Sequence, residues 1–202
     1  RQRQMCIRDR GGLNYDEKSA YGVYAAFGAL VYLTPLLGGL LAEKITGYRR
    51  AIAWGAFLMM AGQFGLMIKN PGIFFAALAL LVLGNGFFKP NISSLIGKLY
   101  KEGDPARDSG FTIFYMGINI GAFLTGVTCG TVGQLEGWHY GFGLAGLGMA
   151  LGLIIFYFAN KSGILEDKGY PPPYAKDKKL LGISWMNLVY IGTFLLLSLI
   201  HI

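Results

Sequence analysis

Long runs without a charged residue divide this sequence and leave few folds open to it. Each run is close to the ~20 residues that cross a hydrocarbon core of about 30 Å, and the runs occupy 19–42, 51–68, 70–88 (continuing past Lys89 to 97), 109–135, 137–160 and 180–202. Because 53% of the residues are hydrophobic and 14% are charged, the chain is far more apolar than a soluble domain needs to be. We therefore expect an all-α membrane protein with six membrane helices.

The Lys and Arg residues gather in alternate loops. They follow the first, third and fifth runs, at 43–50, 98–108 and 161–179, whereas the opposite side holds only Lys18 and Lys69. Loops rich in Lys and Arg remain in the cytoplasm, so this bias predicts the orientation of the chain. It also accounts for the formal net charge of +7, and we expect no nucleic-acid partner.

Both ends of the sequence suggest a segment of a longer protein. The first ten residues hold four arginines and lead into no apolar run, so residues 1–13 are interpreted as a non-native leader. The first run crosses from outside to inside, and we expect another helix before it. The last run stops at Ile202, so we expect the remainder of the same polypeptide to be a partner of this chain.

Lys89 is the one charge inside an apolar run and the best candidate for a binding residue. A charge at membrane depth costs about 2.5–3.5 kcal/mol on insertion scales, so such residues face a cavity or a partner. Every Asp and Glu lies outside the runs, which leaves a substrate carboxylate or an acid on an absent segment as that partner. Snorkelling to the interface is the alternative, and we favour a buried lysine. Pro90 should break the hydrogen-bond ladder beside this charge, so that backbone carbonyls, Asn91 and Ser93 can be offered to a polar cavity.

Two other runs carry a polar side chain close to a proline or between two glycines. Tyr32 precedes Pro35, and a membrane helix tolerates a proline where neighbours satisfy the carbonyl that it frees. Asn119 lies between Gly117 and Gly121, whose spacing predicts a smooth face for close helix packing. Packing between helices is the commoner role for a membrane Tyr or Asn, and contact with a ligand is the functional alternative.

No pattern predicts catalysis, a cofactor or a metal site. Cys6 and Cys129 lack metal or disulfide spacing, and His139 and His201 are far apart in the sequence. The GxGxxG pattern at 141–146 follows no strand and lies within an apolar run, so we interpret its glycines as helix-packing surface rather than a nucleotide loop. We expect neither an enzyme nor a bound cofactor.

Three motifs in a fixed order carry a resemblance to a known family. They are GGLLAEKITGYRR at 38–50, GNGFFKPNISSLIGKLY at 84–100 and FYMGINIGAF at 114–123. With these motifs the chain resembles, from residue 14 to its end, the proton-dependent oligopeptide transporters of the major facilitator superfamily. The resemblance implies helices two to six of the amino-terminal six-helix bundle at 14–160, a cytoplasmic linker at 161–179, and a truncated additional membrane helix at 180–202, as in bacterial members.

The resemblance also implies roles for single residues. Lys89 matches a lysine that lies near the peptide carboxylate and pairs with a helix-one glutamate in proton coupling, while Tyr32 and Asn119 match residues that contact the peptide. Ala122 stands where the family often has Ser, and the helix-one ExxER element does not occur in this chain. A cytoplasmic gating loop is implied at Gly39, Glu43, Lys44, Gly47, Arg49 and Arg50, and helix kinks or packing at Pro35, Pro90, Gly117 and Gly121.

The function implied by the resemblance is proton-coupled import of di- and tripeptides by alternating access. The implied partners are small peptides, protons and the lipid bilayer, and the implied location is the bacterial inner membrane, crossed several times. Two alternatives remain open: a major facilitator transporter of another small nitrogen compound or anion, and a non-transporting membrane sensor or structural protein.

Overall fold

The computed structural model describes residues 16–172, 179–180 and 183–200, so the expected leader at 1–13, Cys6 and His201 lie outside the described residues. The elements are, in chain order, α2 (Glu17–Leu41), the π-helix η1 (Ala42–Thr46), α3 (Tyr48–Gly65), α4 (Pro71–Leu99), α5 (Ala106–Thr125), the π-helix η2 (Gly126–Gly130), α6 (Thr131–Leu135), α7 (Trp138–Lys161), β1 (Lys179–Leu180), β2 (Ile183–Ser184) and α9 (Trp185–Ile200). β1 and β2 pair as a two-residue antiparallel ladder. The other elements are helices, as predicted, although the helix expected at 180–202 begins only at Trp185.

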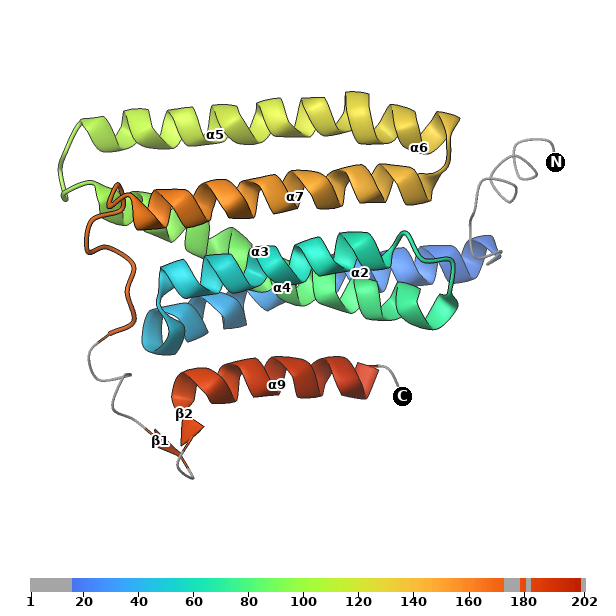
Figure 1. Cartoon of the computed structure of the whole chain (residues 1–202), viewed down its shortest axis with the longest axis horizontal. Helices are drawn as coiled ribbons and strands as arrows, with labels where there is room; N and C mark the ends of the chain where they lie inside the picture. Colours follow the sequence, from blue (N-terminus) through green and yellow to red (C-terminus); the bar gives the residue numbers. More distant parts are fainter. Residues whose placement is uncertain (1–15, 173–178, 181–182, 201–202) are drawn as a thin grey trace.

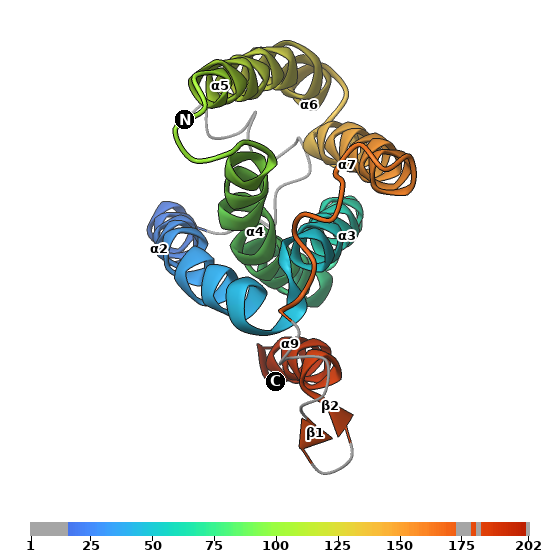
Figure 2. The same cartoon turned by 90° about the vertical axis from the view of Figure 1, so that its left-hand side faces the viewer.

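α4 lies in the middle of the helices. Seen from the end, α2, α3, α5 and α9 surround it (Figure 2). α5 continues through η2 into α6, and this long helical segment runs alongside α7 (Figure 1). The residues expected to bind a ligand therefore come from helices on two sides of α4 and from α4 itself.

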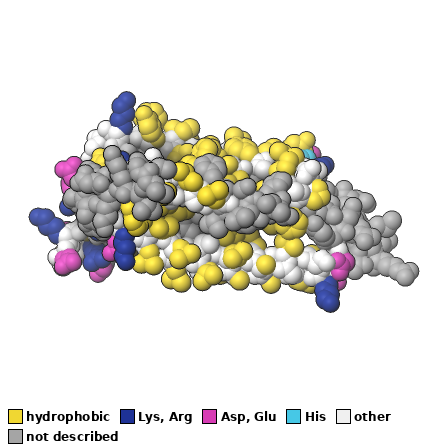
Figure 3. Space-filling view, turned by 90° about the horizontal axis from the view of Figure 1, so that it is seen from below, with side chains coloured by type: hydrophobic (Ala, Val, Ile, Leu, Met, Phe, Trp, Pro, Cys, Tyr) yellow, Lys and Arg dark blue, Asp and Glu magenta, His cyan; other side chains and the backbone are white. Residues whose placement is uncertain are grey.

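Four helical segments are long and apolar enough to cross a membrane. They are Glu17–Thr46, Pro71–Leu99, Ala106–Leu135 and Trp138–Lys161. α3 and α9, the other two of the six predicted spans, are not in this set: α3 has Arg49 and Arg50 in its first turn, and the 16 residues of α9 rise about 24 Å. Charged side chains gather at the two ends of the molecule with an apolar band between them (Figure 3). The protein is a multi-pass integral membrane protein.

Glycines also let α3 and α4 cross closely in the core. A Cβ at Gly55 would lie 2.7 Å from the carbonyl oxygen of Gly84, and one at Gly84 would lie 2.6 Å from Met59. Glycines let two helix backbones approach this closely. Around the crossing, Leu58 and Phe87 are buried in one apolar cluster.

The glycines at 141–146 in α7 pack as the sequence predicts. A Cβ at Gly143 would lie 2.8 Å from Met67, and one at Gly146 would lie 3.0 Å from Phe64, so both meet the end of α3 and the turn after it. Gly117 and Gly121 of α5 differ, because a Cβ there would meet no atom within 4 Å. Their predicted packing face therefore has no partner among the described residues.

Candidate functional site

The two helices that carry Tyr32 and Lys89 each contain a proline, and each proline removes one helical hydrogen bond. Pro35 lies inside α2 and Pro90 inside α4. Each proline lacks an N–H, so the carbonyl four residues before it, that of Val31 or of Gly86, loses its helical donor. The Asn85 amide Nδ2 of α4 donates to the Val31 oxygen over 3.0 Å. The sequence predicted that a neighbour must satisfy the carbonyl freed by Pro35, and that neighbour is Asn85.

The carbonyl freed by Pro90 meets the backbone of α2. Gly38 lies against the Gly86 oxygen so closely that a Cβ at position 38 would collide with it. Beside this contact, Asn91 is fully buried, and its Nδ2 lies 3.2 Å from the Gly38 oxygen and 2.7 Å from the Phe87 oxygen. The expectation that Asn91 faces a polar cavity is therefore wrong, because its amide joins α4 to α2.

Lys89 and Tyr32 lie together on the outer side of this interface. Lys89 Nζ is 5.4 Å from the centroid of the Tyr32 ring, within the range of a cation–π contact. Both side chains are exposed among the described residues, Tyr32 to 77%. The expectation that Lys89 lies deep in the membrane stays a prediction. Among the described residues no carboxylate forms an ion pair with Lys89. The cation is therefore available to a partner outside the described part of the chain.

Asn119 is not part of this pair. It is exposed on α5, and its Nδ2 donates to the Tyr115 carbonyl in the preceding turn over 2.9 Å. α5 has no buried residue. It lies on the opposite side of α4 from α9 (Figure 2). The structure thus brings Tyr32 and Lys89 together and leaves Asn119 with a local hydrogen bond.

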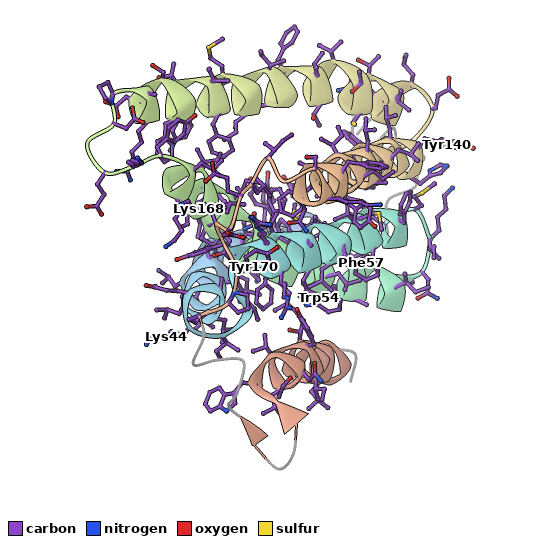
Figure 4. The ribbon with its side chains drawn as sticks, turned by 60° about the vertical axis from the view of Figure 1, so that its left-hand side comes forward. Lys44, Trp54, Phe57, Tyr140, Lys168 and Tyr170 are labelled. Atoms are coloured by element: carbon purple, nitrogen blue, oxygen red, sulfur yellow. The ribbon has the colours of Figure 1, made fainter. Side chains whose placement is uncertain are left out.

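The expected gating loop turns sharply at Gly47. Its φ of 76° lies in the left-handed region that favours glycine, and a Cβ there would collide with the backbone at Tyr170 and Pro171. Glu43 and Lys44 are exposed, with Lys44 at the outer edge of the molecule (Figure 4). Burial and then the Glu43 carboxylate raise the pKa of Tyr48. Gly39 packs on Pro90, because a Cβ at position 39 would lie 3.7 Å from the Pro90 ring.

Arg49 holds the segment that follows α7. It is 5% exposed, and its guanidinium donates to the carbonyls of Lys168, Leu165 and Glu166 and, over 2.7 Å, to the Asn160 side chain. Its backbone N–H donates to Gly169 over 3.1 Å, and the ring of Tyr170 lies 4.4 Å from its Cζ. We name this arrangement, Arg49 with residues 160–170, the arginine clamp; Figure 4 shows Lys168 and Tyr170 on the clamped segment.

The clamp gives Arg49 a role that its place in the implied gating loop did not specify. Arg50, the next residue, is exposed. Arginine suits the buried position because its planar guanidinium offers five N–H donors. Here they bind acceptors at the end of α7 and in the turn that follows it. Sequence reasoning missed this role, since the partners of Arg49 lie 111 to 119 residues farther along the chain. No local signal in the sequence would have found them.

Chemically, the α2–α4 face can bind an anion. It offers an ammonium and a phenol side by side, without a carboxylate of the described chain to neutralise them. The described residues contain no group of three or more His, Cys, Asp or Glu that could hold a metal ion. A family model described as "POT family" matches residues 49–188, more than half of the chain. The chain belongs to the POT family.

Relatives and solved structures agree with this assignment. The chain is 40% identical over 172 residues to an uncharacterized transporter, YclF, of Bacillus subtilis, covering 84% of this chain and 35% of the relative. It is 39% identical over 157 residues to a di-/tripeptide transporter of Lactococcus lactis, covering 77% of this chain and 32% of the relative. It matches a crystal structure of a peptide transporter POT in complex with sulfate with a TM-score of 0.78 and 42% identity, over 95% of this chain and 40% of that one.

These matches confirm the resemblance drawn from the three motifs and the helical membrane fold. The chain spans about a third of the length of these curated relatives. The activity of a complete POT transporter therefore involves many residues outside this chain.

Proposed function

We propose that a full-length transporter carrying this chain imports di- and tripeptides together with protons. The observation that carries the proposal is the pairing of an unneutralised cation, Lys89, with the phenol of Tyr32 on one exposed face of α2 and α4. A POT relative that is 39% identical over 157 residues is named a di-/tripeptide transporter, which supports peptides as the substrate class. Every peptide has a carboxylate that Lys89 can bind.

In this proposal Lys89 has two alternating anionic partners. Without substrate it pairs with a carboxylate on a helix outside this chain, and protonation of that carboxylate releases the ammonium. Lys89 then binds the peptide carboxylate, and Tyr32 and Asn119 hydrogen-bond the peptide. Since an unpaired charge at membrane depth is costly, binding of either partner stabilises a different arrangement of the helices. The two half-transporters then rock around the site, with the loop from Gly39 to Arg50 closing the cytoplasmic side.

Transport of this kind requires no covalent chemistry, and we propose that the protein is not an enzyme. We place it in the bacterial inner membrane with the bilayer, peptides and protons as its partners. The direct test is uptake of a radiolabelled dipeptide into proteoliposomes containing the full-length protein, with and without an inward pH gradient. Gradient-driven accumulation supports peptide symport. If unlabelled peptides fail to compete while a small non-peptide amine or anion is accumulated, the substrate class is wrong; if nothing is accumulated, the protein is a sensor or structural protein.

Orientation gives a prediction that is independent of substrate. The loops at 43–50, 98–108 and 161–179 carry 11 of the 18 Lys and Arg residues, so we expect tags inserted after Gly47 and near Lys168 to be cytoplasmic and one at Gly72 to be periplasmic. The measurement is labelling of single cysteines by a membrane-impermeant maleimide in intact cells. Labelling near Lys168 together with protection at Gly72 would show that the orientation is the opposite of the predicted one.

The substrate contacts give a second prediction. Tyr32→Phe and Asn119→Ala each remove one neutral hydrogen bond to the peptide, which contributes about 0.5–1.5 kcal/mol. We therefore expect the KM for a dipeptide to rise about two- to tenfold for each variant, with unchanged amounts of protein in the membrane. Tyr24→Phe, at an exposed tyrosine two turns earlier on α2, is the matched control and should leave KM unchanged. Unchanged kinetics in all three variants would return Tyr32 and Asn119 to a packing role.

A further inference from the structure

One side chain of α4 replaces the hydrogen bond that Pro35 removes from α2. The Val31 carbonyl lies four residues before Pro35 and has no helical donor, and Asn85 Nδ2 donates to it over 3.0 Å at a partly buried position. In a membrane an unsatisfied carbonyl costs several kcal/mol, because no water reaches it. The Asn85–Val31 hydrogen bond therefore stabilises α2 at its proline.

This hydrogen bond lies next to the Tyr32–Lys89 pair in both helices. Val31 directly precedes Tyr32 in α2, so a bond to the Val31 carbonyl holds the peptide unit that leads into Tyr32. Asn85 and Lys89 are four residues apart in α4, and side chains at this spacing lie on the same face of a helix. One turn of α4 thus holds the backbone of α2, and the next turn presents the cation at 5.4 Å from the Tyr32 ring.

The α2–α4 contact does not depend on Asn85 alone. Thr34 Oγ1 lies 3.0 Å from the Val82 carbonyl of α4, and the buried Asn91 reaches the Gly38 carbonyl over 3.2 Å. Gly86 also lets Thr34 approach closely, since a Cβ at position 86 would lie 2.8 Å from Thr34 Cβ. Loss of the Asn85 amide should therefore shift the segment around Tyr32 without separating the two helices.

We propose that Asn85 is a positioning residue for substrate binding. By holding the Val31 carbonyl it sets the distance between Tyr32 and Lys89, and through that distance the affinity for the peptide carboxylate. Asn85 acts through Tyr32 and does not itself touch the substrate. The transport part of this inference rests on the proposed function, whereas the hydrogen bond to the carbonyl freed by Pro35 does not.

A double-mutant cycle between Asn85 and Pro35 tests the inference, because Pro35→Ala restores a helical N–H donor to the Val31 carbonyl. The four proteins are the full-length transporter, Asn85→Leu, Pro35→Ala and the double variant, each assayed for dipeptide uptake in proteoliposomes and for Tm in detergent. We expect Asn85→Leu to raise KM about three- to tenfold, to leave kcat nearly unchanged and to lower Tm. In the Pro35→Ala background the same change should have little effect on KM or Tm.

Three results would overturn the inference. An equal rise in KM with and without Pro35 would mean that Asn85 does not act through the Val31 carbonyl. A lower Tm with unchanged KM would mean that the hydrogen bond stabilises the fold without affecting substrate binding. A lower kcat with unchanged KM would mean that Asn85 acts in the transport step rather than in binding. If Asn85→Leu does not yield folded protein, Asn85→Ser, which is too short to reach Val31, is carried through the same cycle with the same expectations.

The cycle also separates this inference from the proposed function. If the unmodified protein takes up no peptide, the proposed function fails, and the Tm values alone decide the hydrogen bond. In that case a loss of Tm that Pro35→Ala abolishes still supports the Asn85–Val31 bond, and an equal loss of Tm in both backgrounds refutes it.

Discussion

Replacing Arg49 by alanine is expected to free the segment after α7 for proteolysis. The guanidinium binds the carbonyls of Leu165, Glu166 and Lys168, and each hydrogen bond to a charged group contributes about 1.5–3 kcal/mol. Trypsin must bind the chain around Lys168 in an extended form, which the arginine clamp prevents. In inside-out membrane vesicles we expect Arg49→Ala to raise the rate of cleavage after Lys168 at least about tenfold.

Two variants control this prediction. Arg50→Ala removes the neighbouring, exposed arginine and changes the net charge by the same amount, so it should leave cleavage after Lys168 unchanged. Arg49→Lys keeps the charge but replaces the planar fork with a compact ammonium, and it should protect Lys168 only in part. Equal cleavage rates for Arg49→Ala and the unmodified protein would mean that the clamp does not hold this segment in the membrane.

The second large effect is expected at Lys89. Lys89→Gln removes the charge at similar reach, so neither a carboxylate of another helix nor that of the peptide has its cationic partner. We expect proton-driven accumulation of peptide to be abolished, while exchange of peptide without a gradient survives in part because the amide still forms hydrogen bonds. Lys89→Arg keeps the charge with a different geometry and should be only partly active. Both variants are compared by uptake into proteoliposomes.

Lys98 provides the matched control for Lys89. It is an exposed lysine on the same helix, and its Nζ also lies over a tyrosine ring, 5.0 Å from the centroid of Tyr48. Lys98 lies in the last turn of α4 rather than beside Tyr32, so Lys98→Gln should retain accumulation. Loss of accumulation in both variants would indicate a general effect of charge on α4 instead of a specific role for Lys89.

The sequence predicted the fold because membrane thickness and loop charge are simple constraints. The charge-free runs anticipated the helices, with α4 at Pro71–Leu99 against an expected run of 70–97, and the glycines of α7 pack as expected. α3 and α9 are not among the four described segments that are long and apolar enough to cross a membrane, so their crossing stays a prediction. In α3 the two arginines of the first turn belong to the helix itself, and Arg49 is satisfied by protein carbonyls rather than by water.

The site was predictable only where a local rule applies. The rule that a proline frees a carbonyl showed that α2 needs a donor near Pro35, but the sequence did not identify Asn85, which lies 54 residues after Val31. Asn91 was misinterpreted for the same reason, because its bond to Gly38 depends on how α2 crosses α4. The sequence also did not show which residues cover Lys89, and the described helices leave the side of α4 toward Tyr32 uncovered.

The central claim is that Lys89 binds the peptide carboxylate and couples it to a proton. The most direct measurement is dipeptide uptake by the Lys89→Gln variant of the full-length transporter in proteoliposomes, with and without an imposed inward pH gradient. We predict that the gradient causes no accumulation above equilibrium, while counterflow of labelled dipeptide against internal unlabelled dipeptide remains detectable. Gradient-driven accumulation equal to that of the unmodified protein would contradict the claim and leave Lys89 as a lysine that merely reaches the membrane surface.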